Sequence, residues 1–220
     1  TPSYELLHMV GANADLKFGD ANVKPFAAYQ FGDKSAASSI SAYLLGTTAK
    51  VKAGAGAVNL AGYYMSGDGN TTGDNHAFQN VSAAATYFTP SSMWILIRPG
   101  QSIDTSASVL NNDLTVGGRG SYGMFAGYEG GYGKVFYNAN LGYMGVAKAR
   151  GSESGSIGTE VNAQVGYKVY DNLTASVAAA YAFLGDALAG SGTDRISGVG
   201  YSTADASNPY LVNFQLNYVF

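Results

Sequence analysis

The sequence predicts an all-β fold, a transmembrane antiparallel up-and-down β-barrel, and three observations lead to it. Apolar and polar side chains alternate over long stretches, as they do along a strand with one apolar and one polar face. The connections between these stretches are alternately tight and long. Only 12% of the residues are charged although 46% are hydrophobic, and this charged fraction is about half that of an average soluble domain. An outer surface in contact with lipid accounts for that composition.

The alternation is clearest in residues 210–220, which we expect to form the last strand of the barrel. Its apolar face begins with Tyr210 and ends with Phe220, whereas the other face carries the amides Asn213, Gln215 and Asn217. A soluble sheet would normally carry charges on its wet face. Ten steps of ~3.3 Å, tilted by ~40°, also cover the ~25 Å height of the apolar band of a membrane barrel. The stretch therefore predicts a strand between lipid and a watery lumen.

Eight further strands are expected before it, in two groups of four. The first group is residues 4–18, 23–31, 39–53 and 58–66, and the second is residues 114–129, 134–148, 157–169 and 173–184. In the strand 157–169 we expect Ile157, Val161, Val165 and Tyr167 to face outward. Turns at 19–22, 53–57, 130–133 and 170–172 are short, whereas residues 67–112 and 185–207 form long loops, which we expect to be extracellular. The chain is thus predicted to be a single domain, residues 1–220.

The predicted count of about nine strands is odd, whereas a single-chain bacterial barrel has an even number. Either one strand has been missed, or the chain is the C-terminal portion of a larger barrel that begins before Thr1. We favour the second interpretation. A soluble sandwich or propeller is the alternative fold, and the length of the strands, with aromatic residues near both ends, argues against it.

Sorting the strand residues by parity gives a predicted inner face that combines cations with amides. A modest excess of cations on such a face would raise the local concentration of anions. The alternative is that the same charges lie at the rim and balance one another. The predicted pore-lining residues are Lys17, Lys24, Lys50, Lys52, Arg119, Lys134, Asn138, Asn140, Lys148, Glu160, Asn162, Gln164, Lys168, Asn213, Gln215 and Asn217.

Catalysis and cofactor binding have little support in the sequence. The two histidines are His8, predicted to face lipid, and His76 in a loop, and the chain has no cysteine. Neither a Cys/His cluster nor a haem-attachment motif is present, so we expect no enzyme activity and no cofactor. Asp68, Asn70 and Asp74 have a loose spacing of oxygen ligands for calcium, although outer loops are commonly acidic. The net charge of −3 gives no basic face for nucleic acid.

Two segments resemble the alginate-export-type porins of Gram-negative bacteria, and a third resembles porin-like proteins of such bacteria. They are the motif Tyr63-Tyr64-Met65-Ser66-Gly67-Asp68-Gly69-Asn70, the motif Tyr87-Phe88-Thr89-Pro90, and the C-terminal run that ends in Asn217-Tyr218-Val219-Phe220. The resemblance implies a wide barrel in the cell outer membrane, surrounded by lipid and lipopolysaccharide. It also implies that a long loop narrows the lumen, and that the barrel-assembly machinery recognises the terminal segment ending in Phe220.

The expected function is that of an outer-membrane porin, a channel for passive or facilitated diffusion of small hydrophilic solutes, anions among them. The polar inner face would supply the wetted path and the loop 67–112 would set its width. The alternative, from a different class, is a structural barrel that anchors or sheaths a partner at the outer membrane. Such a partner would be a cytochrome, a secreted passenger or an adhesin.

Overall fold

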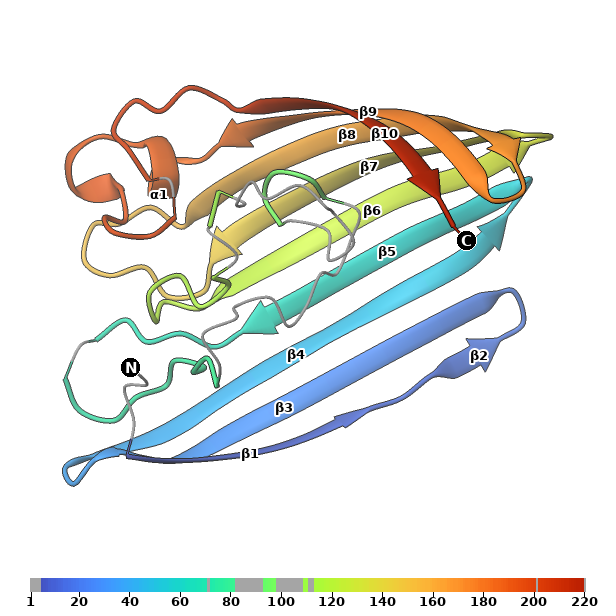
Figure 1. The fold of residues 1–220 in the computed structure, drawn as a ribbon. Coiled ribbons are helices and arrows are strands. Elements are labelled where there is room, and N and C mark those ends of the chain that lie inside the picture. Colours follow the sequence, from blue (N-terminus) through green and yellow to red (C-terminus); the bar gives the residue numbers. More distant parts are fainter. Residues whose placement is uncertain are drawn as a thin grey trace.

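A computed structural model describes residues 5–70, 72–81, 93–97, 109–110, 113–200 and 202–219. These residues form one ten-stranded sheet with a short helix beside it (Figure 1). The strand order is β1-β3-β4-β5-β6-β7-β8-β9-β10, with β2 also paired to β3, and every pairing of strands is antiparallel. The sheet is therefore an up-and-down meander, and the prediction of an all-β antiparallel fold is confirmed.

The strands follow the predicted ranges closely. The strands are β1 (Leu6–Asn13), β2 (Leu16–Phe18), β3 (Ala21–Ser35), β4 (Ser38–Ala53), β5 (Gly56–Met65), β6 (Ser121–Tyr132), β7 (Val135–Val146), β8 (Ser156–Tyr170), β9 (Leu173–Leu184) and β10 (Tyr210–Tyr218). The helix α1 (Asp186–Ala189) and a 3-10 turn (Gly192–Asp194) lie between β9 and β10. The stretch predicted as the first strand is interrupted at residues 14–15, so it gives both β1 and β2, which pair in turn with β3.

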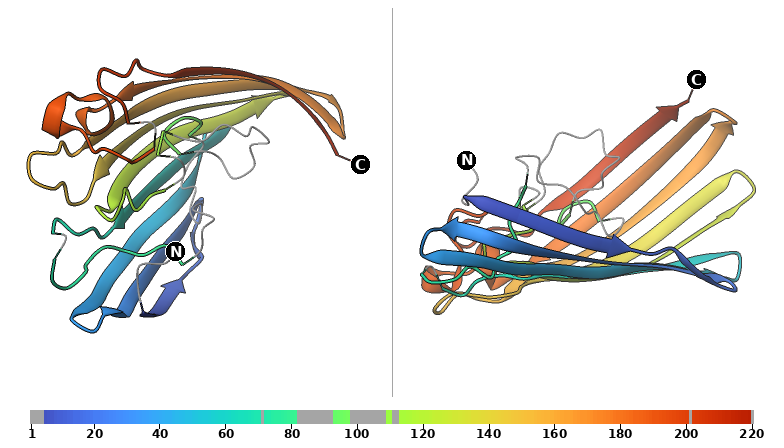
Figure 2. Two further views of the ribbon diagram at one scale, coloured as in Figure 1. Left: turned by 60° about the vertical axis from the view of Figure 1, so that its left-hand side comes forward. Right: turned by 90° about the horizontal axis from the view of Figure 1, so that it is seen from below.

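The sheet is strongly curved but open. Figure 2 shows it as a trough whose two edges are β1 and β10. Within the ranges given above, β1 pairs only with β3 and β10 only with β9. The predicted closure into a barrel is therefore absent from this sheet.

The convex face of the trough is apolar and exposed. In β8, Val161, Val165 and Tyr167 are 42%, 51% and 49% exposed, whereas the alternate residues Glu160 and Asn162 are buried. The same alternation runs through β10, where Phe214 is exposed and its neighbours are half-buried. On β1, the His8 ring stacks on Phe31 with centroids 5.1 Å apart. Alternation along each strand thus separates an apolar outer surface from a different inner one.

The part of the chain described by the structure contains no helix that is long and apolar enough to cross a membrane.

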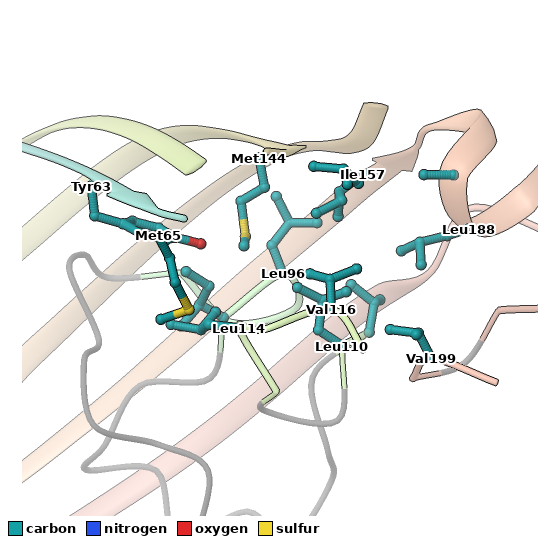
Figure 3. Packing of buried hydrophobic residues seen from close by; sticks show 14 of the residues in the cluster. Tyr63, Met65, Leu96, Leu110, Leu114, Val116, Met144, Ile157, Leu188 and Val199 are labelled. Carbon is teal, nitrogen blue, oxygen red and sulfur yellow. The ribbon is translucent and has the colours of Figure 1, made fainter. Parts of the chain in front are cut away.

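Described residues of the long β5–β6 connection, residues 66–120, pack against the concave face of the sheet. Figure 3 shows its side chains, among them Leu96, Leu110 and Val116, beside Met144 and Ile157 of the strands. These five side chains are buried completely, and each contributes about 1.5–3 kcal/mol relative to an exposed position. The cluster also includes Leu188 and Val199 from the β9–β10 connection. The hydrophobic core of the molecule thus lies inside the trough, between sheet and connections.

Two expectations about this region are wrong. Ile157 was expected to face outward, but its side chain is fully buried in the cluster. The β7–β8 register shifts between Met144 and Gly145, and Gly158 there has φ 153°. Such a bulge turns the residues before it to the other face. The strand expected to start at Leu114 begins at Ser121, because residues 114–119 form turns.

Candidate functional site

The concave face has an apolar half and a polar half. Near the long connections it is covered by the buried cluster described above. Toward the tight turns it carries amides of β7, β8 and β10 that hydrogen-bond to one another, and Ser176 of β9 accepts from one of them. We call these side chains the amide ladder; its members are Asn138, Asn140, Asn162, Gln164 and Gln215.

Hydrogen bonds connect the amide ladder from strand to strand. Asn140 Nδ2 donates to Oδ1 of Asn138 and of Asn162, at 2.8 Å in each case. Asn138 Nδ2 donates to Gln164 Oε1 at 3.0 Å, and Gln164 Nε2 donates to Ser176 Oγ at 3.0 Å. Asn140 lies directly opposite Asn162, and Asn138 opposite Gln164, so cross-strand register brings these groups together. The structure thus joins four predicted pore-lining amides, with Gln215 3.4 Å from Gln164 Nε2.

Glu160 joins the amide ladder to the β5–β6 connection. Its carboxylate accepts hydrogen bonds from the backbone N–H groups of three consecutive residues, Trp94 at 2.7 Å, Ile95 at 2.9 Å and Leu96 at 2.8 Å. Asn162 Nδ2 donates to the same carboxylate at 2.8 Å. The Glu160 side chain is fully buried, so it is covered by the connection and fixes the segment 93–97 onto β8. Its role as an anchor was missed; the only signal was a single acid on a strand face whose neighbouring inward side chains, Asn162 and Gln164, are amides.

A second anchor fixes the connection on the far side of the trough. Gln30 of β3 is fully buried, and its side-chain amide donates to Gln79 O at 2.9 Å and accepts from Gln79 N at 2.7 Å. On β4, Ser41 N donates to Asn75 O at 3.0 Å and Asn75 N to Ser39 O at 2.8 Å. Because β4, β5, β6 and β7 lie between β3 and β8 in the sheet, the described parts of the connection are anchored on both walls of the trough.

Three of the predicted pore-lining cations have carboxylate partners. Lys24 Nζ lies 3.2 Å from Asp15, and Lys50 forms an ion pair with Glu129. Arg119 is not on a strand; it lies in the turn before β6 and its guanidinium donates to Glu153. Two strand lysines of the predicted inner face, Lys24 and Lys50, are therefore neutralised by carboxylates of the protein.

The remaining cations lie at the ends of the strands and are exposed. They are Lys17 in β2, Lys52 near the end of β4, Lys134 in the β6–β7 turn, Lys148 after β7, and Lys168 near the end of β8. Lys134 Nζ lies 6.0 Å from the ring centroid of Tyr167, an outward-facing residue. Lys134 thus lies in a turn beside an outward-facing ring, and Arg119 and Lys148 likewise belong to connections, so the pore-lining role of these three residues stays a prediction. Asn213 and Asn217 lie on β10 with Gln215, on the face predicted to be polar.

The calcium candidates act as hydrogen-bond acceptors within the connection. The Asp68 carboxylate accepts from Asn70 N at 2.8 Å and from His76 N at 3.2 Å, and Asp74 Oδ1 accepts from Ser39 N at 2.9 Å. The hydrogen bond from Ser39 lowers the pKa of Asp74. No group of three or more His, Cys, Asp and Glu side chains that could hold a metal ion occurs in the described ranges.

The buried ion pair Arg119–Glu153 predicts a pH dependence of stability. Hydrogen bonds from Arg119 hold the pKa of Glu153 below its usual range, and the two side chains are only 12% and 14% exposed. A lowered pKa means that the pair contributes stability above the ordinary glutamate pKa of about 4.3, and loses it as the pH falls through the lower folded-state pKa.

We therefore expect Glu153→Gln to be less stable than the native chain at pH 7 in urea unfolding, and the difference to become smaller as the pH is lowered below the ordinary glutamate pKa of about 4.3. A difference that stays the same as the pH is lowered would contradict this role. Asp171→Asn, in the exposed β8–β9 turn, is the control and should have little effect at any of these pH values.

The Ser66-Gly67-Asp68 motif lies where the connection leaves β5. Ser66 Oγ accepts from Tyr43 N at 2.8 Å and donates to His76 O at 2.8 Å. Asp68 N donates to Gly118 O at 2.9 Å. The motif therefore holds the first and last residues of the connection together. Tyr87–Pro90 and Phe220, which also carry the resemblance, lie outside the residues that the structure describes.

Compared with known proteins, the chain matches no protein-family model, no curated protein and no solved structure. The resemblance to alginate-export-type porins stays a prediction from the sequence. The site must therefore be interpreted from its own geometry.

Proposed function

We propose that the chain forms the wall of an outer-membrane channel through which small hydrophilic solutes diffuse. The observation that carries the proposal is the β5–β6 connection, anchored at Gln30 on one wall and at Glu160 on the other, inside a trough that is apolar outside. Beside it runs the amide ladder, which offers neutral donors and acceptors to a wetted path. In this arrangement the connection sets the width of the path.

Insertion in a membrane requires that the two open edges be paired. Backbone N–H and C=O groups exposed to hydrocarbon cost several kcal/mol each, so membrane-spanning sheets are closed. The free edges of β1 and β10 must then pair with each other or with further strands. The exposed apolar residues of the convex face, such as Leu141 and Val165, would meet lipid.

The proposal is tested by reconstituting the full-length protein into planar lipid bilayers. We expect stepwise increases in current as single channels insert. A protein that inserts, resists protease in the bilayer and carries no current would contradict diffusion through it.

The paired lysines predict that such a channel is only weakly selective for anions. Lys50→Glu would leave two carboxylates, its own and that of Glu129, facing each other on the inner wall. The reversal potential in a salt gradient should then shift toward cation preference in the Lys50→Glu and Lys52→Glu double variant. Lys148→Glu, outside the strands, is the matched control and should leave it unchanged. If the native chain, the double variant and Lys148→Glu have the same reversal potential, Lys50 and Lys52 do not line the path of the ions.

A structural barrel that anchors a partner is the second candidate. It is favoured by the buried cluster, which fills the half of the concave face near the long connections. In that case the purified protein should carry no current and should bring a stoichiometric partner with it after crosslinking in the native membrane. A conducting protein that purifies alone would exclude this candidate.

A further inference from the structure

We propose that a recess beside the amide ladder binds a neutral, polyhydroxylated solute such as a sugar. The proposal deepens the channel function and rests on it for its biological role, because the recess would hold a solute on its way along the wall. Recognition itself depends only on the chemistry of the recess, which we argue below.

The recess has a volume of about 450 Å³ and opens on the polar half of the concave face. Cavities of roughly 300–1,000 Å³ are typical of small-molecule sites. Strands β3 to β7 form its wall and Met93 of the β5–β6 connection forms part of its border. The side chains used in the argument are Lys24, Lys50, Asn59, Phe125, Glu129 and Asn140.

The charges of the recess are balanced, which favours a neutral solute over an anion. The ammonium of Lys24 lies 3.2 Å from Asp15, and Lys50 is paired with Glu129. Glu129 is also held by Asn59 Nδ2 at 3.0 Å. An anion would have to compete with these carboxylates for both ammonium groups, whereas a neutral solute can use the remaining N–H donors without breaking either pair.

The recess presents acceptors next to donors, the combination that a hydroxyl group satisfies. Asn140 uses its Nδ2 group toward Asn138 and Asn162, and Asn59 uses its Nδ2 group toward Glu129. The side-chain oxygens of Asn59 and Asn140 accept no hydrogen bond from other residues that the structure describes. The ammonium of Lys50 has further N–H groups beyond the one on Glu129. A hydroxyl group of a solute could donate to the amide oxygen of Asn59 or Asn140 and accept from the ammonium of Lys50.

One end of the recess is apolar and touches the anchored connection. Ala61, Phe125 and Met93 line it, and an apolar surface with an aromatic ring suits the C–H face of a sugar ring. Met93 is followed by Trp94, whose backbone N–H donates to the Glu160 carboxylate. A solute in the recess would therefore contact the connection one residue from its anchor, which gives binding an optical readout.

The experiment is a titration of the purified full-length protein in detergent with glucose, following the fluorescence of Trp94, the only tryptophan of the chain. We expect a saturable change, and no saturable change with gluconate at equal concentration and ionic strength. Asn59→Ala with Asn140→Ala should weaken glucose binding about tenfold, because two hydrogen bonds are lost. Asn213→Ala, an amide on β10 outside the recess, should bind as the native chain does.

A second variant tests the site without removing an amide. Asn140 Oδ1 lies against Gly127, and a methyl group there would overlap it. Because that oxygen is at the end of a flexible side chain, Gly127→Ala should fold normally, displace the acceptor and weaken binding. An unchanged affinity in both variants would overturn the proposal.

Bilayer recordings separate this proposal from the channel function. A conducting protein whose fluorescence does not respond to glucose would overturn the recess as a sugar site and leave the channel standing. Saturable binding without conductance would leave the site and overturn the channel. Tighter binding of gluconate than of glucose would contradict the neutral class of solute.

Discussion

Replacement of Glu160 by leucine is expected to release the β5–β6 connection from the wall of the trough. The three N–H groups of Trp94, Ile95 and Leu96 would lose their acceptor at once. Each hydrogen bond to a charged group is worth about 1.5–3 kcal/mol, so we expect a loss of roughly 3 kcal/mol or more in the stability of this segment. Glu160→Gln should also weaken it, because an amide N–H₂ cannot accept from Ile95 and Leu96.

Trp94 reports the release directly. In Glu160→Leu its fluorescence should shift to longer wavelength and become more accessible to a water-soluble quencher, and in a conducting protein the single-channel current should rise. Glu129→Leu is the matched control, because Glu129 is also an inward carboxylate of the sheet but bonds Lys50 and Asn59. If quenching is the same in native chain and Glu160→Leu, Glu160 does not anchor the connection.

Replacement of Gly67 by alanine is expected to separate the two ends of the β5–β6 connection. A Cβ at Gly67 would overlap the backbone carbonyl of Arg119. A backbone group cannot move aside as easily as the end of a flexible side chain. Asp68 N and Gly118 O, now 2.9 Å apart, would have to part. Overpacking of this kind costs typically 1–3 kcal/mol. Because the hydrogen bond is lost as well, we expect the free energy of unfolding measured in urea to fall by about 3 kcal/mol.

Gly69 provides the control for this prediction. It lies two residues further along, and the nearest atom to a Cβ there is Ala149 O at 3.8 Å, which is ordinary contact. Gly69→Ala should therefore fold and unfold like the native chain. Equal stability of Gly67→Ala and Gly69→Ala would show that the two ends do not approach as closely as the structure places them.

The strands and the orientation of most of their side chains could be predicted from the sequence. In β8 the expected outward residues Val161, Val165 and Tyr167 are exposed and the alternate Glu160 and Asn162 are buried. The tight turns were also predictable, since Gly19, Gly54 and Gly133 adopt positive φ there. All these features depend on a residue and its nearest neighbours in the chain.

The features that were predicted wrongly depend on the partner strand or on a distant segment. Ile157 lies before a register shift against β7, and nothing in its own strand marks the extra residue. Lys50 and Glu129 are 79 positions apart, so the parity that placed Lys50 on the inner face did not show that a carboxylate neutralises it there. Arg119 was assigned to a strand because residues 114–129 were expected to form one, yet Leu114 and Val116 are buried in the cluster.

The sequence by itself determined an all-β meander with an apolar and a polar face, because the two-residue period of a strand is a local consequence of backbone geometry. Only the tertiary structure decided that the sheet is open, that ion pairs balance Lys24 and Lys50, and that Glu160 holds residues 94–96 across 64 to 66 positions of the chain. These contacts depend on how the curved sheet brings distant side chains and backbone together. Hydrophobic periodicity carries no information about such pairs, since every inward position of a strand has the same parity.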